Sequence, residues 1–276
     1  MANTLFLYDG TKESRRTVQI MASILSMSSY QVYTAESVPF GQYSRILLTV
    51  GPKTDPTWIA AVLQQNLSQK EIGMIGVDVS DTMWQRTLND VTNRIEKPLI
   101  YTACIHTAAG AEEIIQAGEQ LRALKIIPQE SDEIVREAIE TFLRQHNTCV
   151  LATGYGTAVR ATPIEYLYND KKIYLFSEGG KKFTNLYRNP QVSLAVFDSY
   201  AGFEKLAGLQ IAGRCRMIEP DEPGYMNIAE AKGIAKERIA AMPVILHVLE
   251  IQLTKAVFLW AGFLKYGKTV RQVYRF

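Results

Sequence analysis

The hydrophobic pattern of this chain changes near residue 128. Before that point, apolar strand-like runs alternate with segments whose apolar residues recur at helical spacing, whereas afterwards short strand-like runs follow one another. Pro128 interrupts the last helical segment of the first half, because proline donates no backbone hydrogen bond. The chain has 276 residues, 47% of them hydrophobic, which is enough for two cores. The change of pattern therefore predicts two domains, residues 1–124 and residues 131–276.

The first half alternates strand and helix. Helices are predicted over residues 14–28, from Asp55-Pro56, from Ser80-Asp81 and after Ala109, and Asp55 and Pro56 are typical of a helix start. Five strands interleaved with these helices imply an α/β domain with a doubly wound parallel sheet that helices cover on both faces. The predicted strands are residues 4–8, 30–34, 45–50, 72–77 and 99–103.

The second half predicts an antiparallel β-barrel with flanking helices. Ser131 is expected to cap a helix over residues 132–145, and a further helix is expected over residues 229–240. Turn residues separate the strands, as they do in hairpins. The predicted strands are residues 149–153, 160–168, 173–177, 192–197, 208–218, 244–251 and 254–260.

A basic turn joins the third and fourth of these strands. It reads Glu178-Gly179-Gly180-Lys181-Lys182. The glycines let backbone N–H groups approach a ligand, and the two ammonium groups suit a doubly charged anion such as phosphate. A solvated pair of surface lysines is the simpler alternative, so the turn alone gives a hypothesis and no more.

The segments flanking this turn strengthen the hypothesis. In their order along the chain they resemble the FMN-binding split barrel of the pyridoxamine 5'-phosphate oxidase-like flavoproteins, over roughly residues 131–276. The resemblance implies that Arg160, Ser177, Lys181 and Lys182 hold the ribityl chain and phosphate of FMN.

The same resemblance implies contacts to the flavin ring and a partner. The backbone of Ala161 and Thr162 would lie against the ring, and Trp260 would reach the flavin bound mainly by the partner subunit. A homodimer is therefore expected.

Two departures from the family pattern affect the expected substrate. Glu165 stands where the oxidase places a second phosphate-binding lysine, and it would repel phosphate if it pointed inward. After Trp260 the oxidase has an arginine and a histidine that hold pyridoxine, whereas this chain has residues 261–267, AGFLKYG. Pyridoxamine phosphate is therefore not the expected substrate.

The first half bears a fainter resemblance to flavodoxins. Residues 7–14 resemble their phosphate loop, and residues 46–52 resemble their third strand and the loop beside the flavin. Thr11 and Ser14, at a helix start, are candidates for a second anion site. Asp9 and Glu13 bring negative charge to the same place, and the usual late glycine is absent, which favours an empty or altered site.

The expected function is that of an FMN-dependent oxidoreductase. Because a flavin transfers hydride or electrons through its own ring, the protein needs no nucleophile, and no catalytic residue is assigned. Its partners would be a small-molecule substrate or an electron donor and acceptor. Two alternatives remain: a non-catalytic flavin- or haem-binding or sensor protein, and an electron relay between two flavins, one in each domain.

Composition argues against other classes of function. The net charge is +2, with 30 basic and 28 acidic residues, so nucleic acid is not an expected partner. No apolar run approaches the roughly 20 residues that span a bilayer, so no membrane association and a cytoplasmic location are expected. Cys104, Cys149 and Cys215 lie in separate apolar strands and are expected to be reduced thiols. Three scattered histidines give no support to a metal site.

Overall fold

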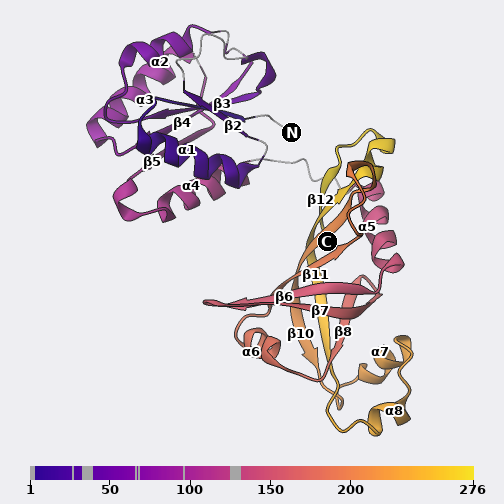
Figure 1. The fold of residues 1–276 in the computed structure, drawn as a ribbon. Coiled ribbons are helices and arrows are strands. Elements are labelled where there is room, and N and C mark those ends of the chain that lie inside the picture. Colours follow the sequence, from indigo (N-terminus) through magenta and orange to yellow (C-terminus); the bar gives the residue numbers. More distant parts are fainter. Residues whose placement is uncertain are drawn as a thin grey trace. The chain divides into compact units, whose positions relative to one another are not determined.

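The computed structural model describes residues 4–26, 28–32, 40–65, 67, 69–95, 97–124 and 132–276 (Figure 1). The chain divides into two compact units, Met1–Pro128 and Gln129–Phe276. The segment between the two predicted domains, with Pro128 and the predicted cap Ser131, lies outside the described residues. Each unit has its own sheet and its own core.

The N-terminal unit contains a five-stranded parallel sheet in the order β2-β1-β3-β4-β5. This is the flavodoxin-like order, and it confirms the predicted doubly wound sheet. The last strand begins and ends two residues later than predicted, and residues 33–34 of the second prediction are not described. The strands are β1 (Thr4–Tyr8), β2 (Ser29–Val32), β3 (Arg45–Val50), β4 (Glu71–Val77) and β5 (Tyr101–Ile105).

Alternate residues of these strands build two cores, one on each face of the sheet. Helices α1 and α4 pack on the face that includes Phe6 and Leu47, and α2 and α3 pack on the face that includes Leu5 and Leu48. The Asp55 side chain accepts a hydrogen bond from Thr57 N (2.8 Å), which is the predicted cap of α2. The helices are α1 (Lys12–Leu25), α2 (Pro56–Leu63), α3 (Asp81–Ile95) and α4 (Glu112–Ala123), with 3-10 turns η1 (Phe40–Gln42) and η2 (Thr107–Ala109).

The C-terminal unit is a closed antiparallel barrel. Its strands run in the order β10-β9-β6-β7-β8-β11, and pairing of β10 with β11 closes the ring, while β12 adds to the edge of β11. This architecture confirms the predicted split barrel. The strands are β6 (Thr148–Tyr155), β7 (Ala158–Asn169), β8 (Lys172–Ser177), β9 (Gln191–Phe197), β10 (Ala207–Ile218), β11 (His247–Trp260) and β12 (Arg271–Arg275).

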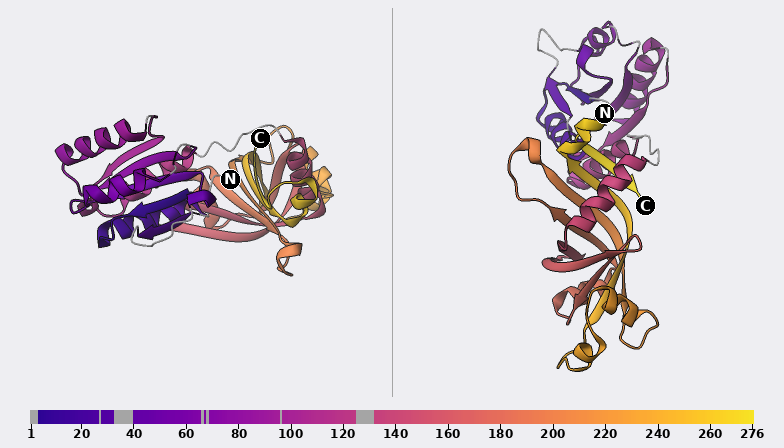
Figure 2. Two further views of the ribbon diagram at one scale, coloured as in Figure 1. Left: turned by 90° about the horizontal axis from the view of Figure 1, so that it is seen from above. Right: turned by 90° about the vertical axis from the view of Figure 1, so that its right-hand side faces the viewer.

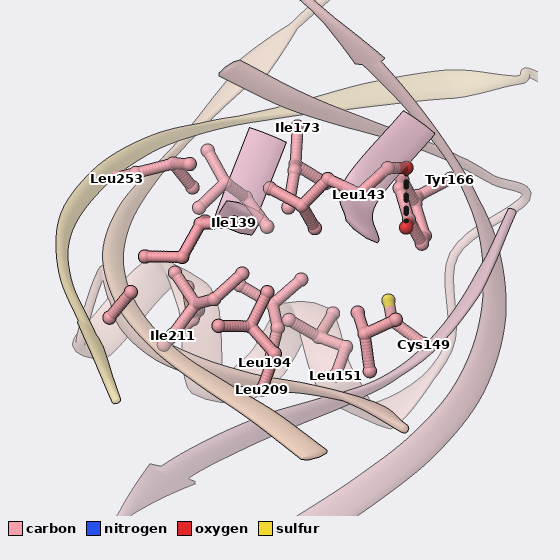
Figure 3. Close-up of a cluster of buried hydrophobic side chains, with 14 of the residues drawn as sticks. Ile139, Leu143, Cys149, Leu151, Tyr166, Ile173, Leu194, Leu209, Ile211 and Leu253 are labelled. Atoms are coloured by element: carbon pink, nitrogen blue, oxygen red, sulfur yellow. Dashed lines mark hydrogen bonds between the residues drawn. The ribbon is translucent and has the colours of Figure 1, made fainter. Parts of the chain in front are cut away.

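Helix α5 (Glu133–Gln145) packs its apolar stripe into the barrel core. Ile139 and Leu143 are fully buried there with Leu151 and Ile211 from the strands, and Tyr166 Oη donates a hydrogen bond to Leu143 O (2.8 Å; Figure 3). The remaining elements flank the barrel. They are α6 (Lys181–Arg188), α7 (Tyr225–Ala231), α8 (Lys236–Ala240), η3 (Phe203–Lys205) and η4 (Ala261–Tyr266).

Three predicted elements of this unit need correction. The strands expected at 244–251 and 254–260 form one strand, β11, because Gln252 and Thr254 fit the outward positions of a continuous alternation. The helix expected over 229–240 is divided between α7 and α8, with Gly233 between them at a positive φ of 79°. Strand β12 was not predicted.

Strand β11 connects the two ends of this unit. Helix α6 and the α7–α8 segment lie near its first residues, whereas α5 and β12 lie side by side near its last residues (Figures 1 and 2). The basic turn and Trp260 are therefore at opposite ends of one strand. Within the described part of the chain, no helix combines the length and the apolar character needed to cross a membrane.

Candidate functional site: a basic turn at one end of the barrel

The basic turn leads directly from β8 into α6. Ser177 ends the strand and Lys181 begins the helix, as the resemblance implied. Gly179 and Gly180 have positive φ angles of 118° and 99°, which other residues rarely adopt. A Cβ atom on either glycine would meet nothing within 4 Å, so the turn is open. No side chain caps the first turn of α6, and its positive end faces this opening.

Ser177 and Lys182 fix the shape of the turn. Ser177 is 3% exposed, and its hydroxyl accepts a hydrogen bond from Gly179 N (3.2 Å). Lys182 Nζ donates to Gly179 O (2.6 Å). Both side chains therefore contact the glycine backbone, so the turn has a defined conformation.

Positive charge is concentrated beside this turn. The pKa of Lys182 is lowered, first because burial disfavours the charged ammonium group and second because Arg160 of β7 lies near it, while Glu178 acts in the opposite sense. Arg160, Lys181 and Lys182 form no ion pair with any residue that the structure describes. These cations are therefore available to an anionic ligand.

A buried amide holds α6 against the hairpin that carries Arg160. Asn185 is 4% exposed, and its Nδ2 lies 3.2 Å from Thr153 Oγ1 and 3.4 Å from Ala158 O. Asn189 Nδ2 also donates to Gly154 O (2.9 Å). The sequence analysis missed Asn185. Its hydrogen-bond partners are 32 and 27 residues away in the sequence, and no local pattern indicates such partners.

The face of β7 beside Arg160 carries an unpaired hydroxyl. Arg160, Thr162 and the core residue Tyr166 share one face by alternation along the strand, whereas Ala161 is exposed on the other face. Thr162 Oγ1 is buried and has no hydrogen-bond partner among the described residues. A buried polar atom without a partner is uncommon, and a bound ligand would satisfy it.

Glu165 does not oppose this positive charge directly. It lies on the other face of β7, with a side chain 57% exposed, and its Oε2 is 3.2 Å from Lys232 Nζ. The expected repulsion of phosphate depended on an inward-pointing carboxylate, and this one points outward and is paired.

Trp260 is far from the turn within one chain. His247, the first residue of β11, pairs with Ser177, whereas Trp260, the last residue, pairs with Ala207. The two ends of β11 are thirteen residues apart, about 43 Å at the usual rise of a strand. The Trp260 ring stacks on Phe258, with centroids 5.7 Å apart. One chain therefore brings Arg160, Thr162, Ser177 and the lysines together and leaves Trp260 apart.

In the N-terminal unit, Asp9 takes up the Thr11 donors of the predicted second anion site, whereas the buried Ser14 hydroxyl has no hydrogen-bond partner among the described residues. Its Oδ1 accepts hydrogen bonds from Thr11 N (3.1 Å) and Thr11 Oγ1 (2.8 Å), and its Oδ2 accepts from Gly51 N (3.0 Å) and Thr54 Oγ1 (2.7 Å). Thr11 Oγ1 also caps α1 by accepting from Ser14 N (3.4 Å). An internal carboxylate thus bridges the loops that follow β1 and β3.

The electrostatics of this edge disfavour a second anion. Burial acts to raise the pKa of Asp9, but the hydrogen bonds from Thr54 and Thr11 outweigh it, so the pKa is lowered and the group is ionised. The pKa of Cys104 is raised by burial and by the nearby Asp81 and Asp78. The carboxyl end of the sheet is therefore negatively charged.

The cysteines are free thiols. Cys149 and Cys215 are buried, and burial raises the pKa of each to about 12, while Cys104 is partly exposed. The described residues contain no group of three or more His, Cys, Asp or Glu side chains placed to hold a metal ion.

The closed barrel with its flanking helices defines the second unit as a split barrel. Residues 135–258 of this unit match the family model described as pyridoxamine 5'-phosphate oxidase, as the resemblance predicted.

Several solved structures are similar to part of this chain. A candidate pyridoxamine 5'-phosphate oxidase from Listeria innocua is 24% identical, with 45% of this chain and 98% of that protein aligned and a TM-score of 0.37. An FAD-binding protein from Mesorhizobium loti is 21% identical (44% and 90% aligned, TM-score 0.37). The haem storage protein HutZ from Vibrio cholerae is 17% identical (42% and 88% aligned, TM-score 0.36). A search of curated proteins gave no match.

Proposed function

We propose that the C-terminal unit binds FMN and that the protein is an FMN-dependent oxidoreductase. The observation that carries this proposal is the unpaired positive charge of Arg160 and Lys182 beside an open glycine turn. Charge-assisted hydrogen bonds from such groups suit the phosphate of a flavin mononucleotide. The family match over residues 135–258 supports the same class of ligand.

Each residue of the turn has a role in this proposal. Lys181, Lys182 and Arg160 bind the phosphate, and Ser177 fixes the conformation of the turn by accepting a hydrogen bond from Gly179 N. The buried Thr162 hydroxyl, which has no partner among the described residues, would hydrogen-bond to the cofactor. Bound FMN would supply hydride or electron transfer, so the task of the protein is to bind it and orient it.

The proposed site includes a second copy of the chain. Trp260 is about 43 Å along β11 from the start of that strand, so it reaches a flavin only if the flavin is held by another subunit. Large aromatic side chains at the end of β9 and in the segment that follows it support self-association: Phe197, Tyr200 and Phe203 are 59%, 69% and 80% exposed. Exposed apolar clusters of this kind mark interaction surfaces. The proposed assembly is a homodimer.

We also propose one flavin in each chain, in the barrel. The ionised Asp9 accepts hydrogen bonds from Thr11, Gly51 and Thr54, and its negative charge would repel a phosphate in the N-terminal unit. An electron relay between two flavins is therefore not the proposed function.

The experiment is to titrate the purified protein with FMN and then add NADH or NADPH followed by an electron acceptor. We expect saturable binding with one flavin per chain, bleaching of the flavin absorbance by the reductant, and its recovery with the acceptor. Protein that stays colourless in excess FMN would contradict the binding proposal. Tight binding without redox cycling would contradict the enzymatic part and favour a non-catalytic binding or sensor protein.

A further inference from the structure

A cavity lies beside Trp260, at the end of β11 far from the basic turn. Its volume is about 470 Å³, within the range of small-molecule sites. Helix α5 lines it with residues that include Glu137 and Phe142, and the end of β11 and η4 line it with residues that include Trp260 and Tyr266. All of its lining belongs to the C-terminal unit, so the cavity is present in a single chain.

The walls of the cavity form a series of aromatic contacts. The ring centroids of His146 and Phe142 are 4.1 Å apart, those of Phe142 and Phe258 are 4.9 Å apart, and Phe258 stacks on Trp260 at 5.7 Å with an interplanar angle of 3°. These contacts hold the rings in fixed orientations. Fixed aromatic surfaces favour a planar ring as ligand.

The charge in the cavity is negative. Its lining includes the carboxylates of Glu137 and Asp198 and the imidazole of His146, with no lysine or arginine. His146 Nε2 is 2.8 Å from Asp198 Oδ1 and its Nδ1 is 2.8 Å from Phe142 O, so both ring nitrogens are engaged. Glu137 forms no ion pair with the described residues. The cavity therefore has two carboxylates and no lysine or arginine to balance them, and this favours a cationic ligand.

We infer that this cavity binds a planar aromatic cation, with its ring among the aromatic walls and its charge beside Glu137 and Asp198. Binding does not depend on the flavin. That the ligand is a substrate rests on the proposed function. In that proposal Trp260 contacts the flavin of the second subunit, so a ring bound in this cavity would lie next to the flavin.

Benzamidine and benzoate are matched probes, because they share size and ring and differ in the sign of their charge. Calorimetric titration of the full chain should give saturable benzamidine binding, one per chain. Benzoate should bind at least about tenfold more weakly, a difference of about 1.4 kcal/mol, because the carboxylates of the cavity attract the amidinium group and repel the carboxylate. Glu137→Gln should reduce the preference for benzamidine over benzoate. The double variant, Glu137→Gln with Asp198→Asn, should abolish this preference. Glu237→Gln, an exposed carboxylate on α8, is the matched control and should have no effect.

Two outcomes would overturn the inference. One is equal affinity of the parent protein for benzamidine and benzoate, and the other is an unchanged preference for benzamidine in the Glu137→Gln variant. Glu137 is exposed and Gln keeps its shape, so this variant tests the inference even if the double variant fails to fold. Flavin absorbance in the same samples separates the two proposals. Protein that binds FMN but not benzamidine contradicts only the cavity, and protein that binds benzamidine but not FMN contradicts only the proposed function.

Discussion

Asn185 of α6 donates a hydrogen bond to Thr153 of β6 (3.2 Å) across 32 residues of sequence. This contact fixes the helix that begins with Lys181 against the hairpin that carries Arg160. The charges of the basic turn are brought together by packing of α6 on the barrel, so the candidate site depends on the integrity of that packing.

Asn185→Ala should destabilise the C-terminal unit by about 1–3 kcal/mol, because it leaves the buried Thr153 hydroxyl without this donor and opens a gap. It should also weaken FMN binding by displacing α6. Chemical denaturation and flavin titration measure the two effects. Asn227→Ala on the exposed face of α7 is the control, and equal stability of the two variants would contradict the structural role of Asn185.

The double substitution of Lys181→Ala with Lys182→Ala should weaken FMN binding by about 10-fold to 100-fold or more, because each charge-assisted hydrogen bond contributes about 1.5–3 kcal/mol. Trp260→Ala should weaken it less, because a ring contact adds to an already anchored phosphate. The charge-matched control is Lys236→Ala with Arg238→Ala on α8. Parent-like affinity in the Lys181 and Lys182 variant would argue against this assignment of the phosphate site.

The pH dependence of binding should report Lys182. Its pKa is lowered by burial and by Arg160, so it loses its proton at a lower pH than an ordinary lysine. Because only the ammonium form binds phosphate in this account, FMN affinity should fall as the pH rises through that lowered pKa. Lys182→Arg should keep its affinity at the same alkaline pH, since guanidinium remains charged. Parallel pH profiles for parent and variant would contradict the role of Lys182.

Asp9→Asn should destabilise the N-terminal unit at neutral pH. The folded-state pKa of Asp9 is lowered, so its stabilising effect is present above the ordinary carboxyl pKa and is lost as the pH falls through the folded value. The variant should therefore unfold more easily at pH 7 than the parent, and the difference should shrink in acid. Thermal unfolding as a function of pH measures this, with Asp90→Asn on the surface of α3 as the control. A constant difference between parent and variant at all pH values would argue against the proposed role.

Phe203→Asp should reduce self-association, because it places a charge on a side chain that is 80% exposed in one chain and is proposed to be buried in a dimer. Light scattering over a range of protein concentrations measures the molecular mass. Val244→Asp, at an exposed apolar residue beside α8, is the control. A parent protein that is monomeric at micromolar concentration would contradict the homodimer.

The sequence predicted features that depend on neighbouring residues. The basic turn is contiguous from Ser177 to Lys182, so it was accessible from the local pattern, whereas the sequence analysis did not assign Glu165 to the outer face of β7. Contacts between distant segments were not accessible from the local pattern. His146 meets Asp198 across 52 residues, and Asp9 meets Gly51 across 42, and no periodicity encodes such pairs. The continuity of β11, by contrast, was present in the local alternation through Gln252 and Thr254, and the prediction broke the strand there wrongly.

The most direct test of the account is a titration of the full chain with FMN that gives both the number of sites and the affinity, repeated for Lys181→Ala with Lys182→Ala. The account predicts one flavin per chain in the parent and a clear loss of affinity in the variant. No flavin uptake by the parent, or two flavins per chain with affinity unchanged in the variant, would contradict it.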